Sequence, residues 1–342
     1  MNGKTEGGRA ERPVRWGILS TALIGREKVI PGMQKSSWCD IRAIASRSRD
    51  AAAEAAKQLG IPGAYGSYEE LFDDPEIEAI YNPLPNHLHV PLTLAAAAKG
   101  KHVLCEKPIA LSAREAEELR GAGGKVLIAE AFMVRFHPQW LRARELVREG
   151  AIGRPVAVQV LFTYFNDDPA NIRNKPDIGG GAVYDIGGYA MLSGRFAFDA
   201  EPLRVVSLID RDPQLRTDRT TSALIDFGEG RHLTFTVSTQ AAPFQRVHIV
   251  GTKARIEIEI PFNAPQGGAM RIFLDDGSKF AGAAVKVITL PEADQYELQG
   301  EAFSKAIRGV EPFPYGVEDA IQNMRVLDAI FRSEKSGGWE RP

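Results

Sequence analysis

Two hydrophobic patterns follow one another along the 342 residues, and this succession constrains the fold more than any other feature. From Pro13 to about Ala131, short apolar runs alternate with helical stretches, which is typical of βαβ units around a parallel sheet. Residues 50–60 are the clearest predicted helix, because an Ala-rich run ends at Gly60. The predicted strands are residues 14–19, 40–46, 79–82, 102–106 and 126–132. We therefore expect a doubly wound parallel sheet.

After His137 the pattern becomes typical of antiparallel strands. Residues 137–150 predict one amphipathic helix, and apolar and polar residues then alternate with a period of two. The strongest predicted strands are residues 156–165, 222–227, 232–239 and 254–260. We expect a large, mostly antiparallel sheet that is open on one face, so that the second half has α+β architecture. A helix over 317–333 is expected to bury an apolar stripe.

Composition excludes several classes of protein. There are 42 Lys and Arg residues against 44 Asp and Glu residues, so nothing favours nucleic acid or a membrane surface as partner. Cys39 and Cys105 cannot form a disulfide framework and lie in no zinc-type cluster, so we predict no metal. No apolar stretch reaches the roughly 20 residues of a membrane span, and residues 1–13 predict a flexible tail without a signal sequence. A cytoplasmic location is the expectation.

The first predicted strand leads into a candidate dinucleotide-binding loop. Aligned on the GxGxxG pattern, the three glycine positions hold Ser20, Ala22 and Gly25. These small residues still let the backbone approach a pyrophosphate at a helix N-terminus. The match is imperfect and equally fits an ordinary strand-to-helix turn.

The end of the second predicted strand favours NADP over NAD. An NAD enzyme places an acid there to bind the ribose hydroxyls, whereas this chain has Ser46, Arg47 and Ser48. The Arg47 guanidinium suits a 2′-phosphate and the adenine face, and the two serines can add hydrogen bonds. The alternative is a solvated helix start with incidental charges.

Residues 82–111 carry a specific family resemblance. The strings NPLPNHLH and GKHVLCEKPIAL resemble the oxidoreductase family of glucose-fructose oxidoreductase, inositol dehydrogenase and the rhizopine-catabolism oxidoreductases (Gfo/Idh/MocA). The strings AFMVRFHPQW, NIRNKPDIGGGAVYDIGGY and YGVEDAIQNMRVLDAI extend the resemblance over nearly the whole chain. These sequence motifs are most similar to those of the branch with D-xylose dehydrogenase, dimeric dihydrodiol dehydrogenase and sugar ketoreductases. Val134 and Gly188 depart from that branch, which leaves the substrate open.

The resemblance implies an arrangement of domains. A tail over 1–13 precedes a dinucleotide-binding Rossmann domain over 14–135, and an α+β domain over 136–313 serves substrate binding and oligomerisation. A C-terminal helix over 314–335 is expected to pack back toward the Rossmann domain. A homodimer or homotetramer through the C-terminal sheet is implied as well.

The resemblance also implies a catalytic set of Lys107, Tyr189 and Asp185. Lys107 follows Glu106 at a strand end, where a cis Lys107–Pro108 peptide would aim it at the nicotinamide ribose and the reacting oxygen. Asp185 and Tyr189 are four residues apart and share one face if the segment is helical. Tyr189 then donates the proton in reduction or accepts it in oxidation, and Asp185 binds a substrate hydroxyl or orients the pair. A plain core aromatic is the alternative for Tyr189.

The remaining predicted contacts fall in loops after strands and in the second half of the chain. The predicted cofactor contacts are Ser20, Thr21, Ala22, Ile24, Gly25, Ser46, Arg47, Ser48, Pro83, Leu84, Asn86, His89, Glu106 and Lys107. The predicted substrate contacts are Arg135, His137, Asn171, Arg173, Asp185 and Tyr189, of which the first four fit domain packing equally well.

The resulting hypothesis is an NADP-dependent oxidoreductase that moves a hydride between nicotinamide and a hydroxyl or carbonyl carbon of a sugar or sugar derivative. One alternative is a trans-dihydrodiol dehydrogenase. An alternative of another class is a non-catalytic NADP-binding regulator of the same fold. The presence of both Lys107 and Tyr189 favours an enzyme with a small carbohydrate or diol substrate.

Overall fold

The computed structural model describes residues 12–124, 126–279 and 282–342, whose contacts form two compact units. The first unit contains the described residues up to 110 together with 114–133 and 294–320. The second contains 111–113, 134–293 and 321–342. Residues 1–11 of the predicted tail lie outside the described residues.

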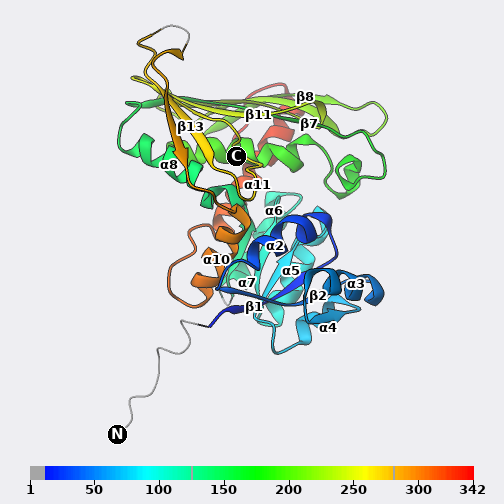
Figure 1. Cartoon of the computed structure of the whole chain (residues 1–342). Helices are drawn as coiled ribbons and strands as arrows, with labels where there is room; N and C mark the ends of the chain where they lie inside the picture. Colours follow the sequence, from blue (N-terminus) through cyan, green and yellow to red (C-terminus); the bar gives the residue numbers. More distant parts are fainter. Residues whose placement is uncertain (1–11, 125, 280–281) are drawn as a thin grey trace. The chain divides into compact units, whose positions relative to one another are not determined.

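The first unit is built on a six-stranded parallel sheet of order β3-β2-β1-β4-β5-β6 (Figure 1). The strands are β1 (Val14–Leu19), β2 (Cys39–Ala45), β3 (Gly63–Tyr65), β4 (Ala79–Asn82), β5 (His102–Glu106) and β6 (Ile128–Ala131). Strand order reverses on either side of β1, as in dinucleotide-binding folds. The predicted doubly wound sheet is confirmed.

Short helices connect these strands, and their ends follow local sequence signals. Ser48 caps α3 by accepting the Ala51 N–H, and α3 stops at left-handed Gly60, as predicted. Ser67 caps α4 by accepting the Glu70 N–H at 3.1 Å. The helices of this part are η1 (Gly25–Val29), α2 (Ile30–Met33), α3 (Arg49–Leu59), α4 (Tyr68–Asp73), η2 (Asn86–Leu88), α5 (His89–Ala98), α6 (Ala113–Glu117) and α7 (Arg120–Gly123). The turn η3 (Met133–Phe136) follows β6, and all but its first residue belong to the second unit.

Helix α10 (Gln295–Ile307) also belongs to the first unit, which differs from the expected domain boundary at residue 313. The Trp16 indole donates to the Ser304 hydroxyl at 3.1 Å, and the Trp16 and Phe303 rings lie 5.4 Å apart. Both aromatic side chains are fully buried. Residues late in the sequence therefore complete the core around β1.

The second unit is built on an eight-stranded sheet of order β14-β13-β12-β11-β7-β10-β9-β8. The strands are β7 (Pro155–Phe165), β8 (Arg204–Arg211), β9 (Asp218–Asp226), β10 (His232–Ser238), β11 (Gln240–Gly251), β12 (Arg255–Ile258), β13 (Met270–Asp275) and β14 (Lys286–Leu290). Only the central β7–β10 pair is parallel among the described pairs. The predicted mostly antiparallel sheet is confirmed.

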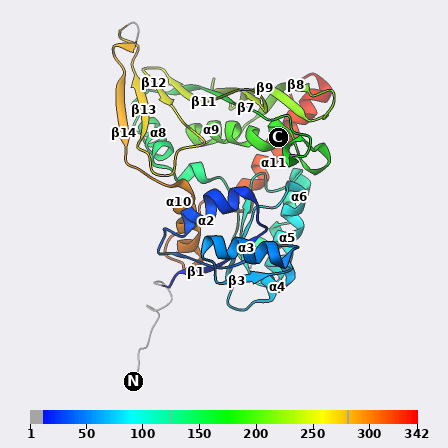
Figure 2. The ribbon, with the colours of Figure 1, turned by 45° about the vertical axis from the view of Figure 1, so that its right-hand side comes forward.

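Helices α8 (Pro138–Arg148) and α9 (Gly188–Phe198) lie on one face of this sheet (Figures 1 and 2). Three short helical turns precede α9: η4 (Ile172–Asn174), η5 (Pro176–Ile178) and η6 (Val183–Gly187). The opposite face carries no helix in the part of the chain that the structure describes.

Helix α11 (Val317–Ser336) is shared by the two units: its residues up to 320 belong to the first, and those from 321 belong to the second. In the second unit, Ser207 of β8 donates its N–H to the Ser333 hydroxyl at 2.9 Å and its own hydroxyl to the Ile330 carbonyl at 2.8 Å. Most of the predicted C-terminal helix is therefore fixed to the second sheet. No helix among the described residues is long and apolar enough to span a membrane.

Candidate active site

The carboxyl ends of the parallel strands form the edge where open α/β sheets bind ligands. After β1, Ser20 adopts a left-handed conformation with φ of 62°, and its hydroxyl accepts the Ala22 N–H at 3.2 Å. Thr21, Ala22 and Ile24 are partly exposed before the helical turn that contains Gly25. Because the first N–H groups of a helix lack partners within it, this turn fits an anionic pyrophosphate.

The segment after β2 presents the Arg47 guanidinium and the hydroxyls of Ser46 and Ser48 at or near the surface. Arg47 and Ser48 are exposed, and Ser46 is half-buried. The neighbouring Arg49 is paired with Glu70 at 2.6 Å. With no acid among residues 46–48, the segment fits the phosphate of NADP better than the free ribose hydroxyls of NAD.

His89 connects the loop after β4 to the segment after β5. Its ring nitrogens lie 2.7 Å from the Pro108 carbonyl and 2.6 Å from the Leu84 carbonyl, and the side chain is fully buried. Burial lowers the pKa of His89 to about 4, although both carbonyl contacts favour the charged ring. The ring is therefore neutral near pH 7 and carries one N–H, so it donates to either the Pro108 or the Leu84 carbonyl, and only the protonated ring would bind both. Pro83 is buried and Asn86 begins η2 in the same loop.

Glu106 and Lys107 follow β5. The Tyr81 phenol donates to the Glu106 carboxylate at 2.7 Å, and the Lys107 N–H donates to the same carboxylate at 3.3 Å. Burial and the adjacent Glu106 raise the pKa of Tyr81. The Lys107–Pro108 peptide is cis, as the family resemblance implied. The buried tyrosine thus fixes the carboxylate directly before the candidate lysine.

In the second unit, Asp185 is the centre of a polar cluster. Its Oδ2 atom accepts from the Tyr164 phenol at 2.5 Å and from Arg173 Nε at 3.1 Å. Burial, followed by the Asp185 charge, raises the pKa of Tyr164, so this phenol remains protonated. The structure brings together the predicted residues Asp185 and Arg173. It adds Tyr164, which sequence analysis missed and which only its place at the end of a long alternating strand could have suggested.

Tyr189 lies one helical turn after Asp185, because η6 continues directly into α9. Its ring centroid lies 5.3 Å from that of Phe262 and 6.0 Å from that of Phe162, and the residue is 6% exposed. Asp185 and Tyr189, four residues apart, thus lie in one continuous helical segment, which is the condition for the two to share a face. The aromatic neighbours restrict the orientation of the ring.

The other predicted substrate contacts have structural partners nearby. His137 is fully buried and caps α8 by accepting the Gln139 N–H at 3.2 Å. Asn171 caps η4 by accepting the Arg173 N–H at 3.0 Å. Arg135 is buried. No group of three or more His, Cys, Asp or Glu residues is arranged to hold a metal within the described ranges.

The fold and the site define the class of a nicotinamide-dependent oxidoreductase. Residues 14–122 match the model of the oxidoreductase family with an NAD-binding Rossmann fold (Gfo/Idh/MocA), and residues 140–257 match the Gfo/Idh/MocA C-terminal domain. The chain belongs to this family and is an oxidoreductase.

Known proteins resemble the chain over almost its full length. An uncharacterized oxidoreductase of Rhizobium meliloti is 48% identical, covering 96% of this chain and 98% of the relative. A D-xylose 1-dehydrogenase (NADP(+)) of Haloferax volcanii is 37% identical, covering 94% and 98%. The solved structure of KijD10, a 3-ketoreductase from Actinomadura kijaniata in complex with NADP and TDP-benzene, has a TM-score of 0.87 at 25% identity, covering 94% and 98%.

Proposed function

We propose that the chain is an NADP-dependent dehydrogenase or ketoreductase of a sugar or sugar derivative. The observation that carries this proposal is the full-length similarity to an NADP-dependent D-xylose dehydrogenase. NADP, when bound, supplies or accepts the hydride, while the protein positions the substrate and moves the proton. In this proposal the first unit binds the cofactor and the second unit binds the substrate.

The cofactor proposal rests on the loops after β1, β2 and β4. The N–H groups between Ser20 and Gly25 would bind the pyrophosphate, and Arg47 with its two flanking serines would bind the 2′-phosphate. Pro83, Leu84 and Asn86 would border the nicotinamide half. His89 would contact the protein backbone and not the cofactor, since both of its ring nitrogens face the Pro108 and Leu84 carbonyls.

A comparison of NADPH and NADH binding tests this assignment. Replacing Arg47 by Ala removes a charge-assisted hydrogen bond worth about 1.5–3 kcal/mol, so NADPH affinity should fall by at least about tenfold while NADH affinity stays constant. Fluorescence titration measures both. Arg42→Ala is a matched control, because Arg42 is an exposed arginine of β2 that lies beside Asp40. Equal affinities of the native protein for the two cofactors would contradict the proposal.

Lys107 and Tyr189 would handle the proton. The Lys107 ammonium would hold the reacting oxygen, and the Tyr189 phenol would donate its proton in reduction or accept one in oxidation. Asp185 would bind a substrate hydroxyl or orient Tyr189, with its carboxylate fixed by Tyr164 and Arg173.

Two substitutions test the catalytic proposal. Lys107→Met and Tyr189→Phe should each lower turnover by about 10² to 10⁴-fold, because general acid–base catalysis contributes that much. The double variant should be little worse than the worse single one, since the two residues act as a unit. NADPH affinity and the circular dichroism spectrum should stay close to those of the native protein.

A matched control and a substrate screen complete this test. Lys99→Met should keep turnover, because Lys99 pairs with Asp73 on the surface. Aldoses, ketosugars and trans-diols are offered with NADP or NADPH, and nicotinamide absorbance is followed. Native turnover in Tyr189→Phe would move the role of proton donor to another group, with His137 next. Activity on trans-diols alone would favour a dihydrodiol dehydrogenase.

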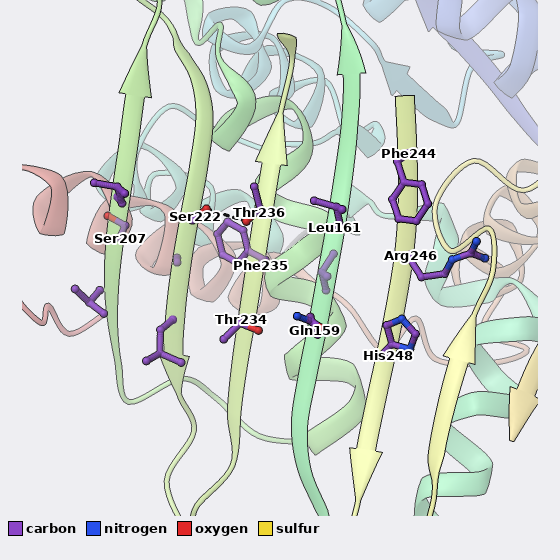
Figure 3. Close-up of a pocket in the computed structure, with 15 residues that line it drawn as sticks. Gln159, Leu161, Ser207, Ser222, Thr234, Phe235, Thr236, Phe244, Arg246 and His248 are labelled. Carbon is purple, nitrogen blue, oxygen red and sulfur yellow. Dashed lines mark hydrogen bonds between the residues drawn. The ribbon is translucent and has the colours of Figure 1, made fainter. Parts of the chain in front are cut away.

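We further propose that the chain forms a homodimer or homotetramer through the bare face of the second sheet. Figure 3 shows residues of β7 to β11 that line a hollow at this face, among them Leu161, Phe244 and His248. The hollow has a volume of about 720 Å³. Leu208, Leu161 and Phe244 line the hollow and are 77%, 37% and 45% exposed. Several large apolar side chains on one face are typical of an interface.

Light scattering tests the oligomer. The native protein should exceed the 37.4 kDa of one chain at micromolar concentration, and Leu208→Glu combined with Phe244→Glu should return it to a monomer. Val287→Glu is the control, because Val287 is 50% exposed on β14 and does not line the hollow. A native monomer would refute the proposal.

A further inference from the structure

The helix that carries Asp185 and Tyr189 begins where its backbone closely approaches the backbone of residues 173–175 and the carboxylate of Asp218. A Cβ on Gly180 would lie 2.6 Å from the Arg173 carbonyl oxygen and 2.7 Å from the Lys175 nitrogen. Gly181 has φ of 119°, and a Cβ there would lie 1.9 Å from the Asp218 carboxylate. Both positions therefore require glycine, and the second requires it because a carboxylate occupies the space of a side chain.

Asp218, the first residue of β9, supplies the acceptor that this helix lacks locally. Its Oδ2 accepts the N–H of Val183, the first residue of η6, at 2.6 Å. Gly181 precedes the continuous helix and Ala182 is its first residue, and neither has a side-chain acceptor. Because it accepts this N–H, the Asp218 carboxylate acts as an N-cap residue would, although it comes from a strand distant in sequence. The side chain is almost fully buried, with 1% of its residue exposed.

The same carboxylate borders a pocket of about 420 Å³ that titratable groups of three other elements also line. Arg211 of β8 is paired with Glu334 of α11 at 2.6 Å. The further titratable groups of the pocket are Tyr184, Asp328, Arg332 and Lys335, and Tyr164 of β7 interacts electrostatically with Asp218. Burial raises the pKa of Asp218 to about 7, against the opposing effects of the Val183 N–H and Arg211. Its charge therefore changes near neutral pH.

We propose that Asp218 is a positioning residue of the active site: its carboxylate holds the first turn of the helix that carries Asp185 and Tyr189, and proton uptake weakens this hold. The proposal rests on the proposed function of those two residues. A carboxylate binds an N–H about twice as strongly as a neutral acceptor does. Turnover should therefore increase with pH as Asp218 loses its proton.

Two variants separate the acceptor from its charge. Asp218→Ala removes the acceptor, whereas Asp218→Asn keeps an oxygen that cannot titrate. We expect deuterium exchange in peptides covering residues 179–189 to be about tenfold faster in the Ala variant and to be only partly restored in the Asn variant, because the amide oxygen is a weaker acceptor than the carboxylate. We expect kcat to fall about tenfold in the Ala variant, with NADPH affinity unchanged. In the Asn variant the rise of kcat with pH near 7 should be absent.

The control is Asp210→Asn, because Asp210 lies on the neighbouring strand β8 and is a surface partner of Arg219. It should match the native protein in exchange and in pH profile. The proposal is overturned if a folded Ala variant exchanges at the rate of the native protein, or if the Asn variant keeps the native dependence of kcat on pH. If the Ala variant does not fold, the pH profile of the Asn variant alone decides. Exchange is measured without substrate, so a failure of the Lys107 and Tyr189 chemistry would leave that result standing.

Discussion

The two sheets of the molecule use their faces differently. In β1 of the parallel sheet every residue from Trp16 to Leu19 is buried, so both faces are consumed by folding. In β10 of the second sheet, buried Leu233, Phe235 and Val237 alternate with half-buried Thr234 and Thr236. Continuous burial is typical of parallel sheets covered on both faces, and alternation is typical of sheets covered on one. The burial pattern of a single strand thus shows whether a sheet retains a face for another partner.

The two units also offer different kinds of atoms to a ligand at the candidate site. The first unit offers backbone N–H groups and small side chains in the loop after β1, a surface suited to a long, charged cofactor. The second offers a network of side chains, in which Tyr164 and Arg173 share one oxygen of Asp185. Backbone atoms suit a ligand common to many enzymes, whereas side chains can be exchanged to suit different substrates.

The largest predicted effect is on the free energy of unfolding when neighbouring residues of one strand are truncated, because the two sheets should respond differently. Ile18→Ala and Leu19→Ala should each lower the free energy of unfolding by about 2–5 kcal/mol, because each leaves a cavity on its own face of β1. In β10, Leu233→Ala should cost about as much, whereas Thr234→Ala should stay within about 0.5 kcal/mol. Urea denaturation measures all four. A small cost at either β1 position, or a large one at Thr234, would mean that the two sheets are covered alike.

The second prediction concerns the ion cluster that fixes α10 to the parallel sheet. Arg308 donates to both oxygens of Glu78 at 2.8 and 3.0 Å, and Arg15 donates to the same carboxylate. Glu78→Gln should cost about 1.5–3 kcal/mol, since hydrogen bonds to a charged group are lost. Glu76→Gln, at an exposed partner of Arg15, should cost no more than about 1 kcal/mol.

This cluster also gives a dependence on pH with a definite sign. Burial alone would raise the pKa of Glu78, but Arg308 and Arg15 lower it to about 2 from 4.5. A lowered folded-state pKa adds stability above pH 4.5 that is lost as the pH falls toward 2. The difference in stability between native protein and Glu78→Gln should therefore shrink between pH 5 and pH 2. A constant difference in urea melts across that range would contradict the assignment.

The smallest predicted effect is local to the first unit. Ser67→Ala removes the hydroxyl that caps α4 and should cost about 1 kcal/mol. Ser67→Asp should restore most of the loss, because a carboxylate accepts the same N–H. If thermal denaturation finds Ala and Asp equally destabilising, the hydroxyl has some role other than capping.

Sequence patterns predicted the long, regular elements and failed where regularity is low. Strands β1, β4 and β5 have the predicted ends, because each is a short apolar run between turn signals. Strand β3 has only three residues, and the register of β11 breaks between Gln240 and Phe244, which obscures its alternation. Such elements depend on pairing with neighbours that local sequence does not reveal.

The candidate site shows the same limit. Family motifs predict Lys107, from the Glu106-Lys107-Pro108 string, and Asp185 with Tyr189, from their spacing of four residues. Tyr164 is 21 residues from Asp185 and Asp218 is 35 residues from Val183, so only the folded chain brings these partners together. A single tyrosine or aspartate in a strand has no pattern that distinguishes it from its neighbours.

The central position of β7 has a consequence for the biosynthesis of the chain. Strand β7 ends at residue 165, yet its two neighbours, β10 and β11, start at residues 232 and 240. While the ribosome makes the intervening segment, β7 has neither edge paired with its native partners. The nascent chain thus carries an apolar strand with both edges open until β10 is complete at residue 238, and with one edge open until residue 251 has left the exit tunnel. Chaperones that bind extended apolar segments would meet this chain during that interval.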